Sequence, residues 1–271
     1  MRQAVDLAPG WLLGRVRLAE LEAAGGQMQE AAATLESVLA ADPGDRYGVA
    51  LKLAALGLAP TPAAAPPAYV ETLFDDYAER FDTSLVEKLG YRMPAILAEE
   101  LAACRSPRAF DAALDLGCGT GLMGEQLRLH VRRLDGVDLS AAMLRKAKAK
   151  GLYDDLKAGD LLDEASGSQS AYDLVTAADV LIYFGDLAPV FRSVARRLRP
   201  SGLFAFSLEI GEGAEAFAVQ ESLRYRHGRE PLRTNLRAAG FTILRWRECS
   251  ARRDRDVDVP GLAVVAALDR R

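Results

Sequence analysis

The segment of this 271-residue chain with the clearest chemical content is Leu114–Gly121, which reads LDLGCGTG. It follows an apolar run that predicts a strand and precedes a run that predicts a helix, as a nucleotide-binding turn requires. Glycines at positions 117 and 119 permit backbone conformations, and a close approach of a ligand, that a Cβ would obstruct. Cys118 supplies backbone and bulk within the turn, and nothing near it indicates a nucleophile. A glycine turn alone is a weak signal.

Three aspartates, expected at the carboxyl ends of three successive strands, make the signal specific. Asp115 lies two residues before the first glycine, where a carboxylate would repel the pyrophosphate of a dinucleotide. A cationic nucleotide without phosphate, such as S-adenosylmethionine, would instead be attracted to it. Asp138 follows 23 residues later, placed to accept hydrogen bonds from both ribose hydroxyls. Asp160 stands in an Ala-Gly-Asp-Leu segment, where it can accept a hydrogen bond from an adenine amino group.

Five segments resemble the motifs of class I S-adenosylmethionine-dependent methyltransferases: Leu114–Gly121, Val137–Ser140, Ala158–Leu161, Tyr172–Leu181 and Leu198–Leu203. The resemblance extends from about Tyr69 to the C-terminus. It implies a methyltransferase with S-adenosyl-L-methionine as its methyl donor. It also implies a set of cofactor-binding residues: Asp115, Gly117, Cys118, Gly119, Asp138, Leu139, Asp160, Leu161 and Ala177.

Four further segments look like those of predicted methyltransferases that carry N-terminal tetratricopeptide repeats: Phe74–Asp82, Leu89–Pro94, Tyr183–Leu187 and Arg224–His227. This likeness implies a repeat arm joined to the catalytic domain, and it defines no acceptor. The resemblance also suggests that Arg92 reaches the methionine carboxylate bidentately, the alternative being a surface arginine. Tyr77 and Phe81, four residues apart on one helix face, either fold over the cofactor as a lid or pack against the sheet.

The catalytic candidates are His227, Tyr183 and Asp179. His227 lies in the long connection between the fifth and sixth predicted strands, and an ordinary histidine pKa near ~6.5 suits a general base. A histidine on a surface loop is the alternative. Asp179 and Tyr183 follow the fourth strand, where they would border the transferred methyl group, and Glu209 at the end of the fifth strand is similarly placed. No base is obligatory, because a sulfonium methyl is already activated and its transfer needs mainly alignment.

Alternating strands and helices must position these residues. Strands are predicted at 112–116, 134–138, 156–160, 173–177, 203–208, 241–246 and 262–268, and helices at 121–129, 140–150, 187–198 and 232–239. Ser140 is the expected cap of the second helix. The alternation predicts an α/β fold with a Rossmann-like, doubly wound and mostly parallel sheet of seven strands. In such sheets ligands bind past the carboxyl ends of the central strands, where the three acids are expected.

The first 58 residues have the period of a helical repeat. Pro9-Gly10 and Pro43-Gly44 stand 34 positions apart, and the apolar residues between them predict two amphipathic helices broken at Gly25-Gly26. The segment resembles one tetratricopeptide repeat followed by a capping helix at 46–56; the alternative is an unrelated helical hairpin. Residues 59–68 read APTPAAAPPA, which predicts a linker. We therefore expect a helical segment (1–58), a linker (59–68) and a methyltransferase domain (69–271).

Composition sets the expectations about partners and location. The formal net charge of −4 gives no sign of a nucleic-acid-binding surface. Arg252, Arg253 and Arg255 alternate with aspartates and predict a solvated loop. Three cysteines without close spacing indicate neither disulfides nor a metal site and fit a cytoplasmic protein. No apolar run approaches the ~18 residues of a membrane span, so no membrane partner is expected.

The expected function is methyl transfer from S-adenosylmethionine to an acceptor. A small molecule is our first choice of acceptor, and a protein recruited by the repeat segment is the second. A dehydrogenase would need a G-x-G-x-x-G turn without Asp115. The remaining alternative is a catalytically lapsed methyltransferase fold that acts as a cofactor-binding or scaffold module through its repeat arm.

Overall fold

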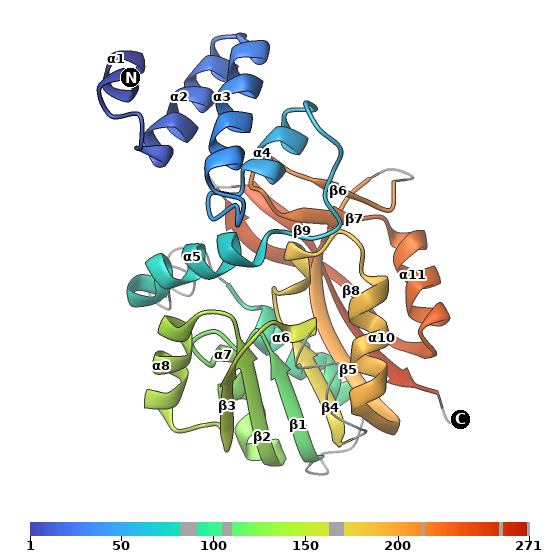
Figure 1. Ribbon diagram of the computed structural model, residues 1–271. Coiled ribbons are helices and arrows are strands. Elements are labelled where there is room, and N and C mark those ends of the chain that lie inside the picture. Colours follow the sequence, from blue (N-terminus) through green and yellow to red (C-terminus); the bar gives the residue numbers. More distant parts are fainter. Residues whose placement is uncertain (82–90, 105–109, 163–170, 213–214, 255–256, 270–271) are drawn as a thin grey trace.

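Figure 1 shows the computed structural model, which describes residues 1–81, 91–104, 110–162, 171–212, 215–254 and 257–269. Among these residues nine strands form one sheet, and its main part has the strand order β3-β2-β1-β4-β5-β9-β8. The first five of these strands are parallel: β3 (Asp155–Ala158), β2 (Val131–Asp138), β1 (Phe110–Leu116), β4 (Tyr172–Ala177) and β5 (Leu198–Ile210). β9 (Val257–Leu268) runs antiparallel to β5 and to β8 (Phe241–Asp254). The predicted Rossmann-like, mostly parallel sheet is confirmed.

Two short strands that were not predicted extend this sheet. β6 (Phe217–Val219) and β7 (Tyr225–His227) form an antiparallel pair, and β7 also pairs with the end of β5 at Glu209 and Ile210. The connection that was expected to be a long loop is therefore partly a strand pair bound to the carboxyl end of β5.

Burial explains the central strands and the helices that cover them. β1 is buried at every position except Asp111, as expected for a parallel strand covered on both faces. One face of the sheet packs on α6 (Met93–Cys104) and α7 (Leu122–Leu127), and the other face packs on α10 (Ala188–Arg197) and α11 (Arg229–Ala238). The Ser140 side chain accepts the Met143 N–H at 3.1 Å and so caps α8 (Ala141–Lys150), as predicted. No helix in the described ranges is long and apolar enough to cross a membrane.

The N-terminal helices have a small apolar core of their own. They are α1 (Arg2–Leu7), α2 (Leu12–Ala24), α3 (Met28–Ala41) and α4 (Val49–Ala55). The predicted break at Gly25-Gly26 is confirmed, with Gly26 at a φ of 80° between α2 and α3. The third predicted helix is shorter than expected. α4 packs Val49 and Leu53 against α2 and α3, whereas Leu51 belongs to the core of the sheet domain, so α4 joins the two parts.

The proline-rich segment is bound to the sheet domain. The Ala63 carbonyl accepts the N–H groups of Gly185 and Asp186 at 2.8 Å each, and the Ala65 N–H donates to the Tyr183 carbonyl at 2.8 Å. Part of the predicted linker at 59–68 is therefore hydrogen-bonded to the sheet domain. The alanines between the prolines supply these donor and acceptor groups. Figure 1 shows the segment running from α4 along the domain to α5 (Pro67–Tyr77).

Candidate active site

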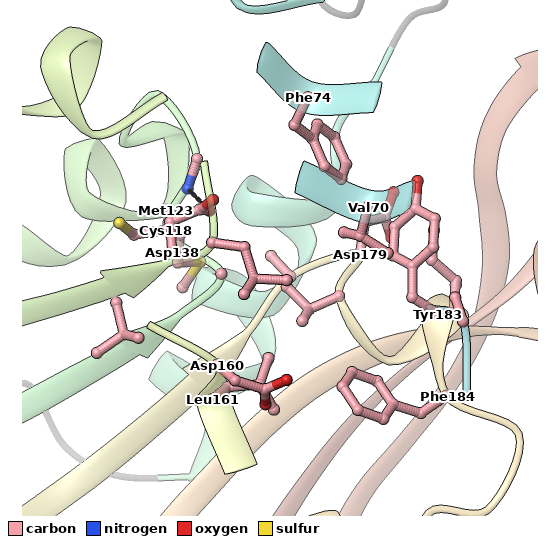
Figure 2. A pocket seen from close by; sticks show the side chains of 18 of the residues that line it. Val70, Phe74, Cys118, Met123, Asp138, Asp160, Leu161, Asp179, Tyr183 and Phe184 are labelled. Atoms are coloured by element: carbon pink, nitrogen blue, oxygen red, sulfur yellow. Dashed lines mark hydrogen bonds between the residues drawn. The ribbon is translucent and has the colours of Figure 1, made fainter. Parts of the chain in front are cut away.

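A cavity of about 260 Å³ lies past the carboxyl ends of β1, β2 and β4, the edge of the sheet where the acids were expected. Figure 2 shows Cys118 and Asp138 on one side of it and Tyr183 and Phe184 on the other, with Phe74 of α5 over the space between them. The cavity therefore lies between the nucleotide-type turn and the segment that follows β4.

The glycine turn follows β1 directly. Gly117 and Gly119 have φ angles of 62° and 54°, in the left-handed region that favours glycine. A Cβ added to Gly117 would come within 2.3 Å of a Val180 methyl carbon, so packing requires this glycine. A Cβ added to Gly119 would meet no atom of the described chain within 4 Å, and Gly119 lines the cavity. The turn thus opens its backbone to a ligand at Gly119.

Asp138, the last residue of β2, fastens this turn and lines the cavity. Its Oδ2 accepts the Gly119 N–H and its Oδ1 accepts the Ser140 N–H, each at 2.8 Å. Burial raises the pKa of Asp138, and the two backbone hydrogen bonds oppose the rise. Each carboxylate oxygen has a second lone pair, so the carboxylate can hold the turn and still accept from a ligand.

Asp115 lies beneath the turn and is not among the described residues that line the cavity. It is 1% exposed, and its two oxygens accept the hydroxyls of Thr176 and Tyr153 at 2.7 Å each. Burial raises the pKa of Asp115 to about 6, with the two hydroxyl hydrogen bonds opposing the rise. Asp115 therefore places a titratable charge under the turn. The structure does not bring its side chain to the cavity, where a direct contact with the cofactor was expected.

The residues after β3 and β4 complete the predicted set. Asp160 and Leu161 line the cavity together with Leu139, and Asp160 Oδ1 accepts the Leu162 N–H at 2.8 Å. Ala177 is fully buried inside β4, outside the described lining, and the next residue, Ala178, lines the cavity in its place.

Aromatic side chains from α5 and the segment after it cover the cavity. The Phe74 ring meets Tyr183 edge-on at 5.6 Å and Phe81 at 6.0 Å between centroids. Tyr77 packs against Phe81 at 5.5 Å but does not belong to the described lining. Of the two residues expected to form either a lid or a packing contact, Phe81 reaches the cavity and Tyr77 supports it from behind.

Two acidic side chains fasten this cover to α8. Asp75 Oδ1 accepts the Ser140 hydroxyl and, at 3.2 Å, the Ala142 N–H at the start of the helix. Glu79 and Lys146 form an ion pair at 2.7 Å. The position of α5 over the cavity therefore depends on the same helix terminus that follows Asp138.

Beyond β4 the cavity wall carries a half-buried acid, Asp179. Asp179 has a φ of 56°, and its Oδ1 accepts the Ser207 hydroxyl at 2.8 Å. The same hydroxyl oxygen accepts the Asp179 N–H at 2.8 Å, which fixes the orientation of the residue. Burial raises the pKa of Asp179, so this carboxylate takes up a proton more readily than an exposed aspartate. Tyr183, which is buried and lines the cavity, lies in the following 3-10 turn.

Two arginines also line this wall, and neither was predicted to belong to a site. Arg252 is 5% exposed, and its Nη1 lies 2.5 Å from Glu209 Oε1. The expectation of a solvated loop at this position was wrong, because β8 continues past it and Glu209 provides a buried partner. Arg224, directly before β7, lies 4.0 Å from the same Glu209 oxygen.

The sequence of the central strands matches a known family. Residues 114–204 match a family model described as a methyltransferase domain. The ubiquinone biosynthesis O-methyltransferase of Marinobacter nauticus is 32% identical over 114 residues, which cover 40% of this chain and 48% of that protein. This chain carries a methyltransferase domain. The protein of the same name from Methylobacterium sp. is 30% identical over 131 residues, covering 44% of this chain and 52% of its own length.

The chain spans about half the length of the curated relatives it matches. Among solved structures, an S-adenosylmethionine-dependent methyltransferase from Clostridium acetobutylicum superposes with a TM-score of 0.54 at 19% identity, covering 73% of this chain and 99% of that one. The N-methyltransferase NodS from Bradyrhizobium japonicum, in complex with S-adenosyl-L-homocysteine, gives 0.50 at 21% identity, covering 64% and 86%. These likenesses concern the fold of the methyltransferase domain.

The part of the cavity at Gly119, Asp138 and Asp160, which we call the donor half, has the chemistry that S-adenosylmethionine requires. Asp138 and Asp160 offer carboxylate acceptors where a nucleoside presents hydroxyl and amino donors, and Asp115 adds negative charge beneath the turn. The open space at Gly119 is a cradle that a Cβ would fill. The two arginines of the described lining lie on the wall beyond β4 and not at this turn, which suits a cationic nucleotide better than a pyrophosphate.

Two predicted residues lie away from this cavity. Arg92 is exposed directly before α6, between buried Tyr91 and buried Met93, so the chain turns its side chain outward. His227 is 2% exposed within β7, and its Nε2 lies 2.8 Å from the Phe184 carbonyl oxygen. Burial lowers the pKa of His227. Neither residue belongs to the described lining of the cavity, so this geometry does not support a role of Arg92 in binding the cofactor or of His227 as general base, and both stay predictions.

Proposed function

We propose that this chain transfers a methyl group from S-adenosylmethionine to a small-molecule acceptor, with an oxygen atom as the first acceptor to test. One observation carries the proposal: a single cavity joins a donor half, at Gly119, Asp138 and Asp160, to a half that contains the half-buried acid Asp179 and the side chain of Tyr183. The choice of oxygen is supported by the relatives, which are named O-methyltransferases.

In the donor half each residue has a separate role. Asp138 accepts the ribose hydroxyls while it holds the Gly119 N–H, and Asp160 accepts the adenine amino group. Leu139 and Leu161 pack against the nucleoside, and the backbone at Gly117, Cys118 and Gly119 admits the methionine part. Asp115 favours the cationic donor from beneath the turn, through attraction at a distance rather than by contact.

In the second half the chain positions the acceptor and takes its proton. When bound, S-adenosylmethionine supplies an activated methyl group, to which an acceptor lone pair bonds as the carbon–sulfur electron pair returns to sulfur. Asp179 accepts the acceptor proton, helped by its raised pKa and its fixed orientation against Ser207. Tyr183 borders the acceptor. Positioning supplies up to ~7–11 kcal/mol, and a general base ~10²–10⁴-fold in rate.

The helical segment is the second part of the proposal. We assign residues 1–58 to an arm that contains one tetratricopeptide-like unit, 59–68 to a connecting segment and 69–271 to the methyltransferase domain. The helical hairpin of α2 and α3, with its own apolar core, supports this division. Such an arm offers a site for a protein partner beside the small-molecule acceptor.

Calorimetric titration with S-adenosylhomocysteine tests the donor assignment. Wild type should bind near micromolar concentration, and Asp138→Ala should bind at least about 10-fold more weakly, because a hydrogen-bonding charged group is lost. Asp155→Ala, an exposed change on the neighbouring strand, should bind like wild type. Asp138→Asn keeps a side-chain oxygen that can accept the Gly119 N–H, so it controls for disruption of the turn. Urea unfolding shows whether each variant folds. If wild type does not bind, or if Asp138→Ala binds equally well, the proposal fails.

A transfer assay with a labelled methyl donor on fractionated cell extract then identifies the acceptor class. Label in low-molecular-mass products supports a metabolite acceptor. Label found only in proteins would replace it by a protein acceptor recruited through the arm.

A further inference from the structure

The cavity wall beyond β4 contains one pair of opposite charges that neutralise each other. Arg252 Nη1 lies 2.5 Å from Glu209 Oε1, and both side chains are buried. The other oxygen of Glu209 accepts the Gln220 amide at 2.7 Å. The Glu209 carboxylate is therefore occupied on both sides, and Arg252 brings no net charge to the cavity.

Arg224 is held differently. Its nearest carboxylate oxygen in the described chain is that same Glu209 Oε1 at 4.0 Å, which is longer than a hydrogen bond. It also interacts with the Tyr183 side chain. A guanidinium has five N–H donors in a planar fork, and these contacts engage only part of them. Because the side chain lines the cavity and is 28% exposed, the remaining donors are available to a ligand.

The neighbours of Arg224 keep it in this place. Tyr225, the next residue, is fully buried, and its hydroxyl donates to the Pro62 carbonyl at 2.9 Å. Its ring also packs on Phe217 at 5.9 Å. The backbone at Arg224 is thus anchored to the proline-rich segment and to β6, which restricts where its guanidinium can lie.

Asp179 adds an acidic group to the same wall. It interacts electrostatically with Arg224, and Ser207 occupies one of its oxygens. A ligand at this wall would therefore meet a cation with spare donors next to an acid able to take up a proton. A small molecule with an anionic group at one end and a hydroxyl or amine nearby matches both.

We propose that Arg224 binds a carboxylate of the methyl acceptor, so that the acceptor is a small carboxylic acid with a hydroxyl or amino nucleophile. The inference rests on the proposed methyl transfer and adds the acceptor's chemical class. A planar guanidinium fork matches a carboxylate in two parallel hydrogen bonds. Arg224 lines the same cavity of about 260 Å³ as the donor residues, which agrees with a small acceptor held beside the donor.

The test compares acids with their neutral analogues. Hydroxy- and amino-substituted aromatic and aliphatic carboxylic acids, each paired with its carboxamide, are titrated against the protein saturated with S-adenosylhomocysteine. For the acids that bind, the carboxamide should bind at least about 10-fold more weakly. Arg224→Gln should lose the same factor for the acid while its affinity for S-adenosylhomocysteine stays within about twofold of wild type. Arg226→Gln, two residues along and exposed, is the matched control and should leave both affinities unchanged.

Three outcomes would overturn the inference. The first is that no acid of the panel binds at millimolar concentration, and the second is that carboxamides bind as well as acids. The third is that Arg224→Gln weakens S-adenosylhomocysteine but not 5′-methylthioadenosine, which lacks the amino-acid part; Arg224 would then hold the carboxylate of the donor. A wild type that binds no S-adenosylhomocysteine instead removes the proposed function, so the two failures are distinguishable.

Discussion

Asp115→Asn should remove a specific pH dependence from the stability of this protein. The Asp115 carboxyl is buried, and burial raises its pKa to about 6 from an ordinary value of 3.8. Because the folded protein binds this proton more tightly than the unfolded chain, protonation of Asp115 stabilises the fold. That contribution is fully present below about pH 4 and is lost as the pH rises through about 6.

The size of the effect follows from the shift. About two pKa units, at about 1.4 kcal/mol each, correspond to about 3 kcal/mol. Of this, about 2 kcal/mol is lost between pH 4.5 and 7. Asparagine cannot titrate, although it keeps one oxygen for the hydroxyls of Thr176 and Tyr153. Between pH 4.5 and 7 the free energy of unfolding of the variant should therefore rise by about 2 kcal/mol relative to that of wild type. Any pH-independent cost of the substitution does not change this difference.

Urea unfolding of both proteins at several pH values between 4.5 and 7 measures this difference. Taking the difference matters, because burial also raises the pKa values of Asp138 and Asp179 and makes wild type lose stability in the same direction. Asp111→Asn, an exposed change on the same strand, controls for the general effect of removing one negative charge. A difference between Asp115→Asn and wild type that stays flat across the range would refute the assignment of a buried, proton-binding carboxyl under the turn.

Two further predictions concern the turn and its cover. Gly119→Ala should cost about 1–2 kcal/mol for its left-handed backbone and should also weaken S-adenosylhomocysteine at least about 10-fold, because the new methyl enters the cradle. Gly151→Ala shares the positive φ and the open surroundings but lies outside the cavity, so calorimetry should show a normal affinity beside a similar loss of stability in urea. Asp75→Ala removes two hydrogen bonds to the start of α8, at Ser140 and Ala142, and should lower stability by about 1–2 kcal/mol and weaken donor binding several-fold. Asp76→Ala is its exposed neighbour and control; equal thermal melts and equal affinities for the two variants would show that this tether is not needed.

The parallel core could be predicted because its signals are local. β1 and β2 are apolar runs that end at a glycine or an acid, β4 is a similar run that ends two residues before Asp179, and each lies within a few residues of its predicted position. β6 and β7 could not be predicted in this way. Each has three residues, and β7 contains Tyr225, Arg226 and His227. The two strands depend on pairing with each other and, for β7, with the end of β5, rather than on their own periodicity. For the same reason His227 was expected in a long connection between strands and not within a strand.

The two halves of the site differ in the same respect. The donor half is built from positions next to strand ends, such as Gly119 and Asp138, so spacing along the chain predicts where they meet. The other half depends on pairs distant in sequence: the partner of Glu209 is Arg252, inside a run of alternating charges. From the sequence such a run is typical of a solvated loop, and only the buried acid on β5 makes it part of a wall. Arg92 is the opposite case, a residue expected at the cofactor that is exposed. Its position in the sequence does not tell on which side of the chain its side chain lies.

The distribution of charge along the cavity bears directly on how a reaction could be oriented there. Acids at the end of β2 and after β3 lie at one part of the cavity, and the spare donors of Arg224 lie at another. The carboxylates at the first part attract a cationic donor, and the Arg224 guanidinium at the second offers an anionic acceptor a hydrogen-bonding partner beside Asp179. If both bind as proposed, the enzyme aligns its substrates largely through these fixed charges, which agrees with a reaction whose main need is alignment. A dinucleotide would instead bring its pyrophosphate to the glycine turn, next to Asp138 and above Asp115, and the same charges would oppose it.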